Sequence, residues 1–120
     1  MSLSISIRHV NRIVVLELWG RLSVRERTLL HFAADLMERG ERNFLISLEH
    51  LSYLDNSGLG QLCWIYTAVQ SRGGDMKLLK TPARFKKLLK ATQLDMVFQS
   101  FECEVDAIAA MQLCRPALSA

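Results

Sequence analysis

The sequence predicts a single α/β domain over residues 1–120, with a mixed, mostly parallel sheet of four to five strands and about four helices. Three observations lead to this prediction. Apolar runs of strand length alternate with segments of helical periodicity in the order β-β-α-β-α-β-α-β-α, which is typical of a parallel sheet with right-handed crossovers. Half of the 120 residues are hydrophobic, which is enough for a sizeable core. No linker or internal repeat divides the sequence.

The first two strands are expected to form an antiparallel hairpin at one edge of the sheet. Leu3, Ile5 and Ile7 alternate with polar residues, and this period of two indicates a strand with one buried and one solvent-facing side. After a polar break at residues 11–12, the more apolar run 13–19 predicts a better-buried partner strand. The break is short enough for antiparallel pairing.

The first helix is expected to begin at Ser23. Ser23 and Glu26 have the Ser-x-x-Glu spacing of a capping box, in which each side chain satisfies a free backbone N–H group of the other residue. Gly40 is placed to end the helix in a left-handed turn. The apolar residues at helical spacing between these ends are Leu29, Ala33, Leu36 and Met37. The next apolar run, residues 44–48, predicts a strand buried on both faces.

A second helix is expected to begin near Ser57 and to end at Gly73-Gly74. Its apolar stripe consists of Leu59, Leu62, Tyr66 and Val69. Gly58 and Gly60 lie in its first turn, where each costs roughly 1 kcal/mol of helix propensity. A close approach of a neighbouring backbone or of a partner is therefore expected at these glycines.

The last third of the sequence predicts two more strands and two more helices. Residues 76–80 form a strand pattern, and Thr81 and Pro82 are expected to open a helix as its N-cap and first residue. Residues 96–98 are the candidate for a short final strand. The inner face of the third helix is predicted to contain Phe85, Leu88 and Leu89, and that of the closing helix Val105, Ile108, Ala109, Met111 and Leu113.

Composition favours a cytoplasmic protein without membrane insertion. No apolar run approaches the ~20 residues that span a bilayer, and the alternating N-terminus differs from a signal peptide. Three cysteines without Cys-x-x-Cys spacing, Cys63, Cys103 and Cys114, are expected to be reduced, buried thiols. The net charge of +3 arises partly from a basic stretch that we interpret as a solvated helix surface. Its residues are Lys77, Lys80, Arg84, Lys86, Lys87 and Lys90.

Residues 53–60 are the stretch of greatest chemical interest. An apolar strand pattern is followed by Asp55, Asn56 and Ser57, and then by the second helix. In a parallel sheet this stretch follows the carboxyl end of the third strand, where such folds place their functional sites. Free backbone N–H groups at a helix N-terminus accept either a capping side chain or a phosphate. On residue chemistry alone, both roles stay open for Ser57.

Enzymatic and nucleotide-binding interpretations fail on specific residues. Asp55 and Leu59 stand where a Gly-x-Ser-x-Gly nucleophile motif around Ser57 requires glycine. No histidine is placed by spacing as a general base, and no metal-ligand spacing occurs, so no catalytic residue, metal or cofactor is expected. Cys63 occupies the third glycine position of a Gly-x-Gly-x-x-Gly motif, whose later acidic residue is also missing. Nucleic acid is not an expected partner, because the basic stretch carries no recognition motif.

Residues 44–60, with the sequence FLISLEHLSYLDNSGLG, resemble the signature of the STAS-domain anti-sigma factor antagonists. Further matches are Gly20-Arg21-Leu22, Gly73-Gly74, Thr81-Pro82, Leu94-Asp95 and Val97-Phe98. The resemblance implies a STAS-like domain in which Ser57 is phosphorylated by an anti-sigma factor that is a serine kinase of the histidine-kinase-like ATPase fold. A phosphatase is a further implied partner.

The same resemblance implies an anti-sigma factor antagonist that regulates transcription by partner switching. The unmodified protein binds the anti-sigma factor and releases the sigma factor, and phosphorylation ends this binding. The residues expected to bind the partner are Tyr53, Asp55, Asn56, Ser57, Gly58, Leu59 and Gly60. The alternative is a STAS-fold subunit or scaffold without a switch, either the partner of a transporter-associated ATPase or a stressosome component. The chain differs from the family pattern at Asn56, where a second Ser or Thr is frequent, and at Ser47, where Asp is usual.

Overall fold

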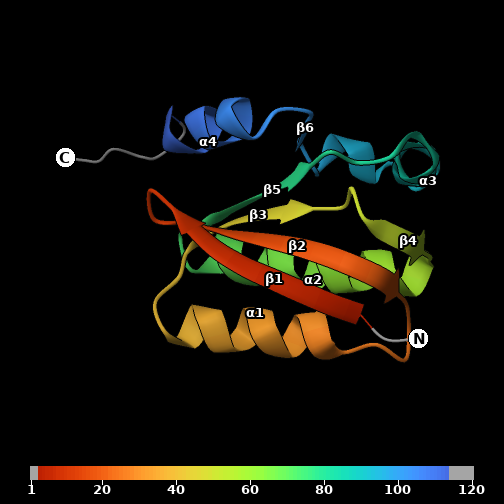
Figure 1. Cartoon of the computed structure of the whole chain (residues 1–120), viewed down its shortest axis with the longest axis horizontal. Coiled ribbons are helices and arrows are strands. Elements are labelled where there is room, and N and C mark those ends of the chain that lie inside the picture. The colour runs from red at the N-terminus through yellow and green to blue at the C-terminus, as the bar shows by residue number, and fades with distance from the viewer. Residues whose placement is uncertain (1–2, 114–120) are drawn as a thin grey trace.

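A six-stranded mixed sheet with helices on both faces forms the structure, a computed structural model that describes residues 3–113 (Figure 1). The strands are β1 (Leu3–Val10), β2 (Ile13–Leu22), β3 (Asn43–Ser47), β4 (Leu51–Leu54), β5 (Asp75–Leu79) and β6 (Ser100–Phe101). The helices are α1 (Thr28–Glu38), α2 (Asn56–Ser71), α3 (Ala83–Ala91), α4 (Glu104–Leu113) and the 3₁₀ helix η1 (Leu94–Met96). The predicted α/β class and mixed, mostly parallel sheet are confirmed, with one strand more than the expected four to five.

β2 is the strand on which the sheet is built. It pairs antiparallel with β1, and Asn11 and Arg12 form the connecting turn with positive φ angles of 50° and 70°. The first half of β2 pairs in parallel with β3 and the second half with β4, with a change of register between Gly20 and Arg21. β5 and β6 extend the sheet beyond β3. β1 therefore lies at an edge, as predicted.

β4 is the strand that the sequence pattern did not indicate. Only Leu51 and Leu54 of its four residues are buried, so it shows too little alternation to be recognised locally. It is held by β2, a segment distant in sequence. The Ser52 hydroxyl, for example, donates a hydrogen bond to the Gly20 carbonyl 32 residues earlier (2.8 Å).

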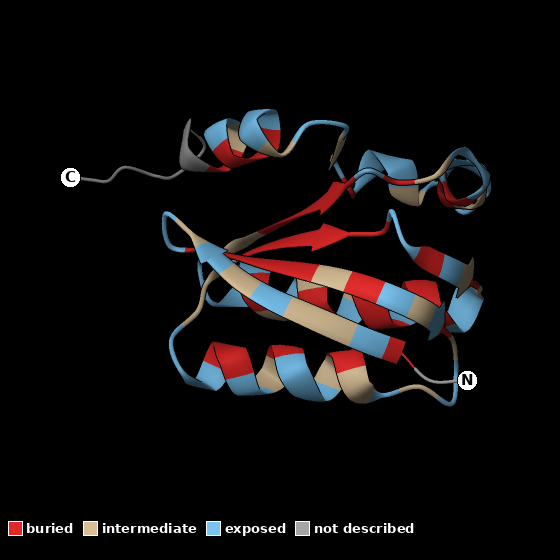
Figure 2. Ribbon diagram, viewed as in Figure 1, coloured by how far each residue is buried: buried red, intermediate tan, exposed pale blue. Residues whose placement is uncertain are grey.

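The sheet separates two apolar layers, and Figure 2 shows β3 and β5 buried between them. The larger layer joins the sheet to α1, α2 and α3 through Leu29, Ala33, Leu36, Met37, Leu59, Leu62, Ile65, Val69, Phe85 and Leu89. These helices therefore bury the faces that their periodicity predicts, with Tyr66 and Leu88 at the margin. The smaller layer, on the opposite face, joins α4 to the sheet through Ile13, Val15, Leu45, Leu79, Ala107, Ile108 and Met111.

The inner face of α4 is narrower than expected. Ile108 and Met111 are buried as predicted, but Val105 and Ala109 are exposed and Ala107 takes their place. The apolar residues of α4 are spread around the helix instead of being gathered on one side, so periodicity alone could not assign this face. The side chain of Leu113 lies outside the described residues.

α1 begins at Thr28 rather than at Ser23. The Glu26 N–H group donates to the Ser23 carbonyl (3.0 Å), so residues 23–26 form a turn in place of the expected capping box. The Ser23 carbonyl also accepts a hydrogen bond from the Gln61 side chain of α2 (2.9 Å), a tertiary contact that a local pattern cannot reveal. Gly40 follows the helix with a φ angle of 101°, as predicted.

α3 begins one residue later than expected, with Pro82 rather than Thr81 at the N-cap. Thr81 is buried, and its hydroxyl shares a hydrogen bond with the hydroxyl of Ser100 in β6 (2.8 Å). Its side chain therefore links two segments of the fold instead of capping the helix.

The prediction of a strand at residues 96–98 is wrong. Gln93, with a left-handed φ angle of 64°, precedes η1, and Phe98 packs edge-on against Tyr66 with 5.6 Å between ring centroids. Of the three apolar residues of this segment, Phe98 is buried in the core, whereas Met96 and Val97 are exposed. The strand itself, β6, begins two residues later beside β5.

Lys77 is not part of a solvated helix surface. It lies in β5 and is 6% exposed, and its ammonium group contacts the Asp75 carboxylate (3.1 Å) and the Gln99 side-chain oxygen (2.8 Å). A buried ammonium group requires such partners. The other members of the basic stretch are exposed, as predicted.

The cysteines are less buried than expected. Cys63 is half-buried, and burial raises the pKa of its thiol, whereas Cys103 is exposed. Both are free thiols. Cys114 lies outside the described residues.

An ion pair reinforces the contact between α4 and the sheet. The Arg8 guanidinium group of β1 contacts both carboxylate oxygens of Glu104 (3.0 and 2.6 Å) and one of Glu17 (3.2 Å). Its hydrogen bonds hold the pKa of Glu104 below the usual range. Since Arg8 lies in the edge strand β1 and Glu104 is the first residue of α4, this pair ties the start of α4 to the edge of the sheet.

The Arg8–Glu104 pair predicts a pH dependence. A carboxyl group whose pKa is lower in the folded state stabilises the fold at pH values above its pKa in the unfolded state, about 4.3 for glutamate. This stabilisation is lost as the pH falls through the pKa of the folded state. Glu104→Gln should therefore lower the free energy of unfolding at pH 7 by up to ~1 kcal/mol, because the pair is partly exposed. The difference from wild type should shrink toward pH 3. Urea denaturation across this range tests it, with Glu102→Gln, at a more exposed pair, as control. A pH-independent difference would contradict the assignment.

Candidate functional site

The candidate site, residues 53–60, lies where β4 ends and α2 begins. We expected the strand at residues 44–48 to lead directly into it, but β4 intervenes and delivers the site to the end of β2. The location beyond the carboxyl end of a parallel strand is as predicted.

Asp55 is the residue that caps α2. Its backbone is extended (φ −123°, ψ −172°), and its Oδ1 atom accepts a hydrogen bond from the Gly58 N–H group (2.9 Å). Its carbonyl oxygen accepts the first helical bond, from the Leu59 N–H group (2.9 Å). Ser57 lies in the first helical turn and is exposed. Of the two roles left open for Ser57, capping is therefore assigned to Asp55.

Tyr53 and Arg21 hold the capping residue in place. The Tyr53 hydroxyl donates a hydrogen bond to the Oδ2 atom of Asp55 (3.2 Å). The Arg21 guanidinium group lies 3.9 Å from the centre of the Tyr53 ring, within the range of a cation–π interaction. Both oxygens of the Asp55 carboxylate therefore have a donor, and the loop before Ser57 is fixed from the β2 side.

The two glycines of the first turn have different environments. A Cβ atom on Gly58 would lie 2.3 Å from the Leu22 carbonyl oxygen, so only glycine allows the helix to approach β2 this closely. No heavy atom lies within 4 Å of the corresponding position on Gly60. The expected close approach of a neighbouring backbone is thus found at Gly58, and Gly60 opens to solvent.

The seven expected partner-binding residues divide by exposure. Asn56, Ser57 and Gly60 are exposed, and Tyr53 and Asp55 are half-buried. Gly58 and Leu59 are buried, the latter 2% exposed, so these two belong to the core and are not available on the surface of the free chain.

Trp64 is a surface residue that the sequence reasoning missed. It follows Gly60 by four residues, so it lies on the same side of α2, and its side chain is 51% exposed. The signal in the sequence was its spacing of seven residues from Ser57, two helical turns. Ser57, Gly60 and Trp64 thus form one exposed stripe.

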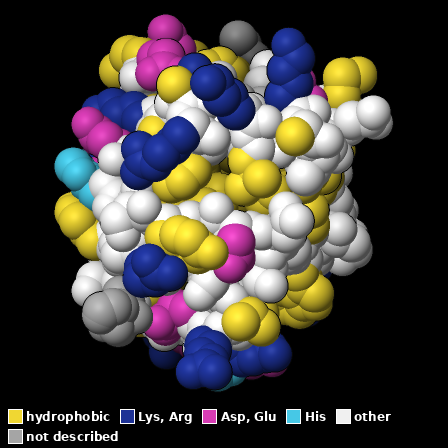
Figure 3. Space-filling view, turned by 90° about the vertical axis from the view of Figure 1, so that its right-hand side faces the viewer, with side chains coloured by type: hydrophobic (Ala, Val, Ile, Leu, Met, Phe, Trp, Pro, Cys, Tyr) yellow, Lys and Arg dark blue, Asp and Glu magenta, His cyan; other side chains and the backbone are white. Residues whose placement is uncertain are grey.

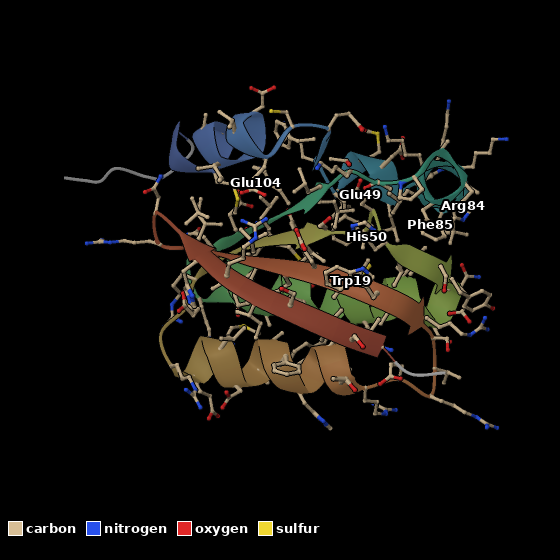
Figure 4. All side chains as sticks on the ribbon, in the orientation of Figure 1. Trp19, Glu49, His50, Arg84, Phe85 and Glu104 are labelled. Atoms are coloured by element: carbon tan, nitrogen blue, oxygen red, sulfur yellow. The ribbon has the colours of Figure 1, made fainter. Side chains whose placement is uncertain are left out.

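Two of the three histidines contact side chains other than Ser57. His50 stacks on Trp19 (5.1 Å between ring centroids, Figure 4), and His9 contacts Glu41 (2.9 Å). Among residues 3–113, no cluster of three or more His, Cys, Asp or Glu side chains could hold a metal ion. Within the same residues, no helix is long and apolar enough to cross a membrane.

A family comparison assigns this fold. The family model described as STAS domain matches residues 4–107. The chain therefore belongs to the STAS-domain family, and the resemblance found in residues 44–60 is confirmed.

The relatives narrow the comparison. The anti-sigma F factor antagonist of Paenibacillus polymyxa is 24% identical over 115 residues, which cover 94% of this chain and 98% of that protein. An anti-sigma factor antagonist from Mycobacterium paratuberculosis has a TM-score of 0.80 at 16% identity, covering 92% of this chain and 95% of that one. The phosphorylated form of SpoIIAA, a Bacillus cell fate determinant, has a TM-score of 0.68 at 21% identity, covering 89% and 98%. At these identities the structural likenesses show the fold.

The two glycines provide a matched pair of variants. Gly58→Ala is expected to lower the free energy of unfolding by about 1–3 kcal/mol, because the new methyl group would collide with the Leu22 carbonyl oxygen. Gly60→Ala should raise it by up to ~1 kcal/mol, because alanine has the higher helix propensity and the space is open. Urea denaturation of both variants measures the difference. Equal effects would contradict the packing of α2 on β2.

Proposed function

We propose that this chain is an anti-sigma factor antagonist that binds an anti-sigma factor when Ser57 is unmodified and releases it when Ser57 is phosphorylated. The observation that carries the proposal is the division of roles at the start of α2. Asp55 caps the helix, so the exposed Ser57 hydroxyl is free to be modified without loss of the cap. The names of the Paenibacillus polymyxa and Mycobacterium paratuberculosis relatives support the antagonist role.

The proposed docking surface consists of the accessible residues Tyr53, Asp55, Asn56, Ser57 and Gly60. Gly58 and Leu59 support it from below. Gly60, without a side chain, allows a partner to approach the helix backbone closely. Asn56, where the family often has a second hydroxyl, leaves Ser57 as the single phosphoacceptor of this turn.

Phosphorylation would act through interface electrostatics. A phosphate adds about −1.5 to −2 charges at pH 7, and the N–H groups at the start of α2 favour negative charge there. The fold is therefore retained, while a partner fitted to a neutral hydroxyl meets a charged and larger group. A penalty of ~3 kcal/mol would weaken binding roughly a hundredfold. The proposed kinase is the anti-sigma factor itself, with a phosphatase to reverse the reaction in the cytoplasm.

Phosphate mapping tests the modification. The chain is incubated with ATP and, in turn, each anti-sigma factor kinase of its source organism, and the products are mapped by mass spectrometry. Phosphate is expected on Ser57 of the wild type, and none on Ser57→Ala. If phosphate appears only at other residues, or if none of the kinases modifies the chain, a STAS-fold subunit or scaffold without a switch is favoured.

Binding of Ser57 variants tests the switch. Ser57→Ala should bind the anti-sigma factor as tightly as the wild type and resist inactivation by ATP, and Ser57→Asp should bind about tenfold or more weakly. Ser71→Asp, at the other end of α2, adds the same charge about 21 Å away and should bind normally. Isothermal titration calorimetry measures the affinities. Equal binding of the Ala and Asp variants would exclude the switch, and loss of folding in Ser57→Asp would point to a structural role.

A further inference from the structure

A hollow of about 330 Å³ lies between β4 and α3, next to the candidate site. Its lining consists of Ser52, Tyr53, Leu54, Arg84, Phe85 and Leu88. Figure 1 shows β4, α3 and the beginning of α2 at the same end of the molecule. Figure 3 looks onto this end, where hydrophobic side chains gather in the middle of the face and Lys and Arg side chains, with several Asp and Glu side chains among them, stand around them.

The floor of the hollow is apolar and continuous with the core. Leu54 and Phe85 are buried, and Leu88 packs against the larger apolar layer while remaining partly accessible. Covering the accessible part of this floor, at Leu88, would remove apolar surface from water, which favours a protein contact. Its volume suits one large aliphatic or aromatic side chain.

The rim on the α3 side is positively charged. The Arg84 guanidinium group is fixed there, because it donates a hydrogen bond to the Leu51 carbonyl (3.0 Å) and lies 4.4 Å from the centre of the Phe85 ring (Figure 4). Lys87 is exposed and one turn further along the same side of α3. Lys86, by contrast, points away and pairs with Glu102 (2.7 Å).

Tyr53 connects this hollow to the candidate site. It lines the hollow and also donates the hydrogen bond to the capping residue Asp55, two residues before Ser57. A protein docked over Ser57 therefore lies next to the hollow. Binding energy at protein interfaces concentrates where a large side chain fills such a pocket close to the contact centre.

We propose that the hollow between β4 and α3 is the anchor pocket of the docking surface, filled by one large apolar side chain of the anti-sigma factor. An acidic residue of the same partner pairs with Arg84 and Lys87 at the rim, as charge complementarity requires. The inference rests on the proposed function, and it names the chemistry that the partner presents. The anchor contributes to the affinity for the partner in both phosphorylation states of Ser57, and the phosphorylation of Ser57 lowers the total affinity.

Filling the hollow from β4 tests the anchor. Ser52 is exposed at its edge, and Ser52→Trp places a bulky side chain there without removing an apolar contact. Ser71→Trp is the matched control, because both serines are exposed and donate their hydroxyl to a backbone carbonyl at 2.8 Å. With the anti-sigma factor that binds the unphosphorylated wild type, Ser52→Trp should lose roughly tenfold or more in affinity, and Ser71→Trp less than about twofold.

Reversing a rim charge is the second test, and it leaves the floor intact. Lys87→Glu should weaken binding roughly threefold to tenfold at low salt, and the difference from wild type should shrink at high salt. Lys90→Glu changes the same charge at another exposed position of α3 and should have a smaller effect. Circular dichroism and urea denaturation establish whether each variant is folded. If Ser52→Trp does not fold, the binding of Lys87→Glu alone tests the proposal.

The outcomes separate this inference from the proposed function. If Ser57→Asp weakens binding while Ser52→Trp and Lys87→Glu bind like their controls, the anchor pocket is wrong and the switch stands. If Ser52→Trp and Lys87→Glu weaken binding and Ser57→Asp does not, the anchor pocket stands and the phosphorylation switch is wrong. If no anti-sigma factor of the source organism binds the wild type, both fail.

Discussion

The contact of α2 with the end of β2 is the constraint on which the geometry of this protein depends. β2 pairs with three strands, with β3 up to Glu17 and with β4 from Gly20 onward, so one long strand sets the position of the loop that follows β4. Gly58 then brings the first turn of α2 against the Leu22 carbonyl. Because this approach is limited by backbone atoms, the start of α2 has little freedom to shift. Ser57 is therefore presented at a fixed place by the end of β2.

The first turn of α2 separates structural from surface roles along consecutive residues. Asp55 satisfies the helix end, Gly58 and Leu59 face the core, and Ser57 and Gly60 face solvent. A helix end normally depends on its capping hydroxyl or carboxylate for about 1 kcal/mol of stability. Here the carboxylate supplies this contribution, so the hydroxyl two residues later can change its charge at little cost to folding.

Much of the fold was predictable because much of it is encoded locally. The buried faces of α1 and α2 follow from periodicity, and the turn at Gly40 follows from the left-handed backbone that glycine favours. The errors occur where a distant segment decides. β4 exists because β2 offers it a partner. Ser23 forms no capping box because the Glu26 N–H group bonds to its carbonyl in a turn, which Gln61 of α2 also contacts. Within the site, the sequence predicted the location and left a capping role open for Ser57, but assigning the cap to Asp55 required its extended backbone and its hydrogen bond from the Gly58 N–H group.

The two apolar layers differ in size, and the free energy of local opening should differ with them. Among the side chains that the structure describes, α4 contributes Ala107, Ile108 and Met111 to its layer and is tied to β1 by Arg8 and Glu104, whereas α1, α2 and α3 share one large cluster. Free energies of local opening follow such differences in buried contact. Amide protons of α4 should exchange with solvent ahead of those in α2, through an excursion in which α4 detaches while the remainder keeps its native packing. The described contacts that support Ser57, through Asp55, Tyr53 and Gly58, lie outside α4, so this surface should keep its structure during that excursion.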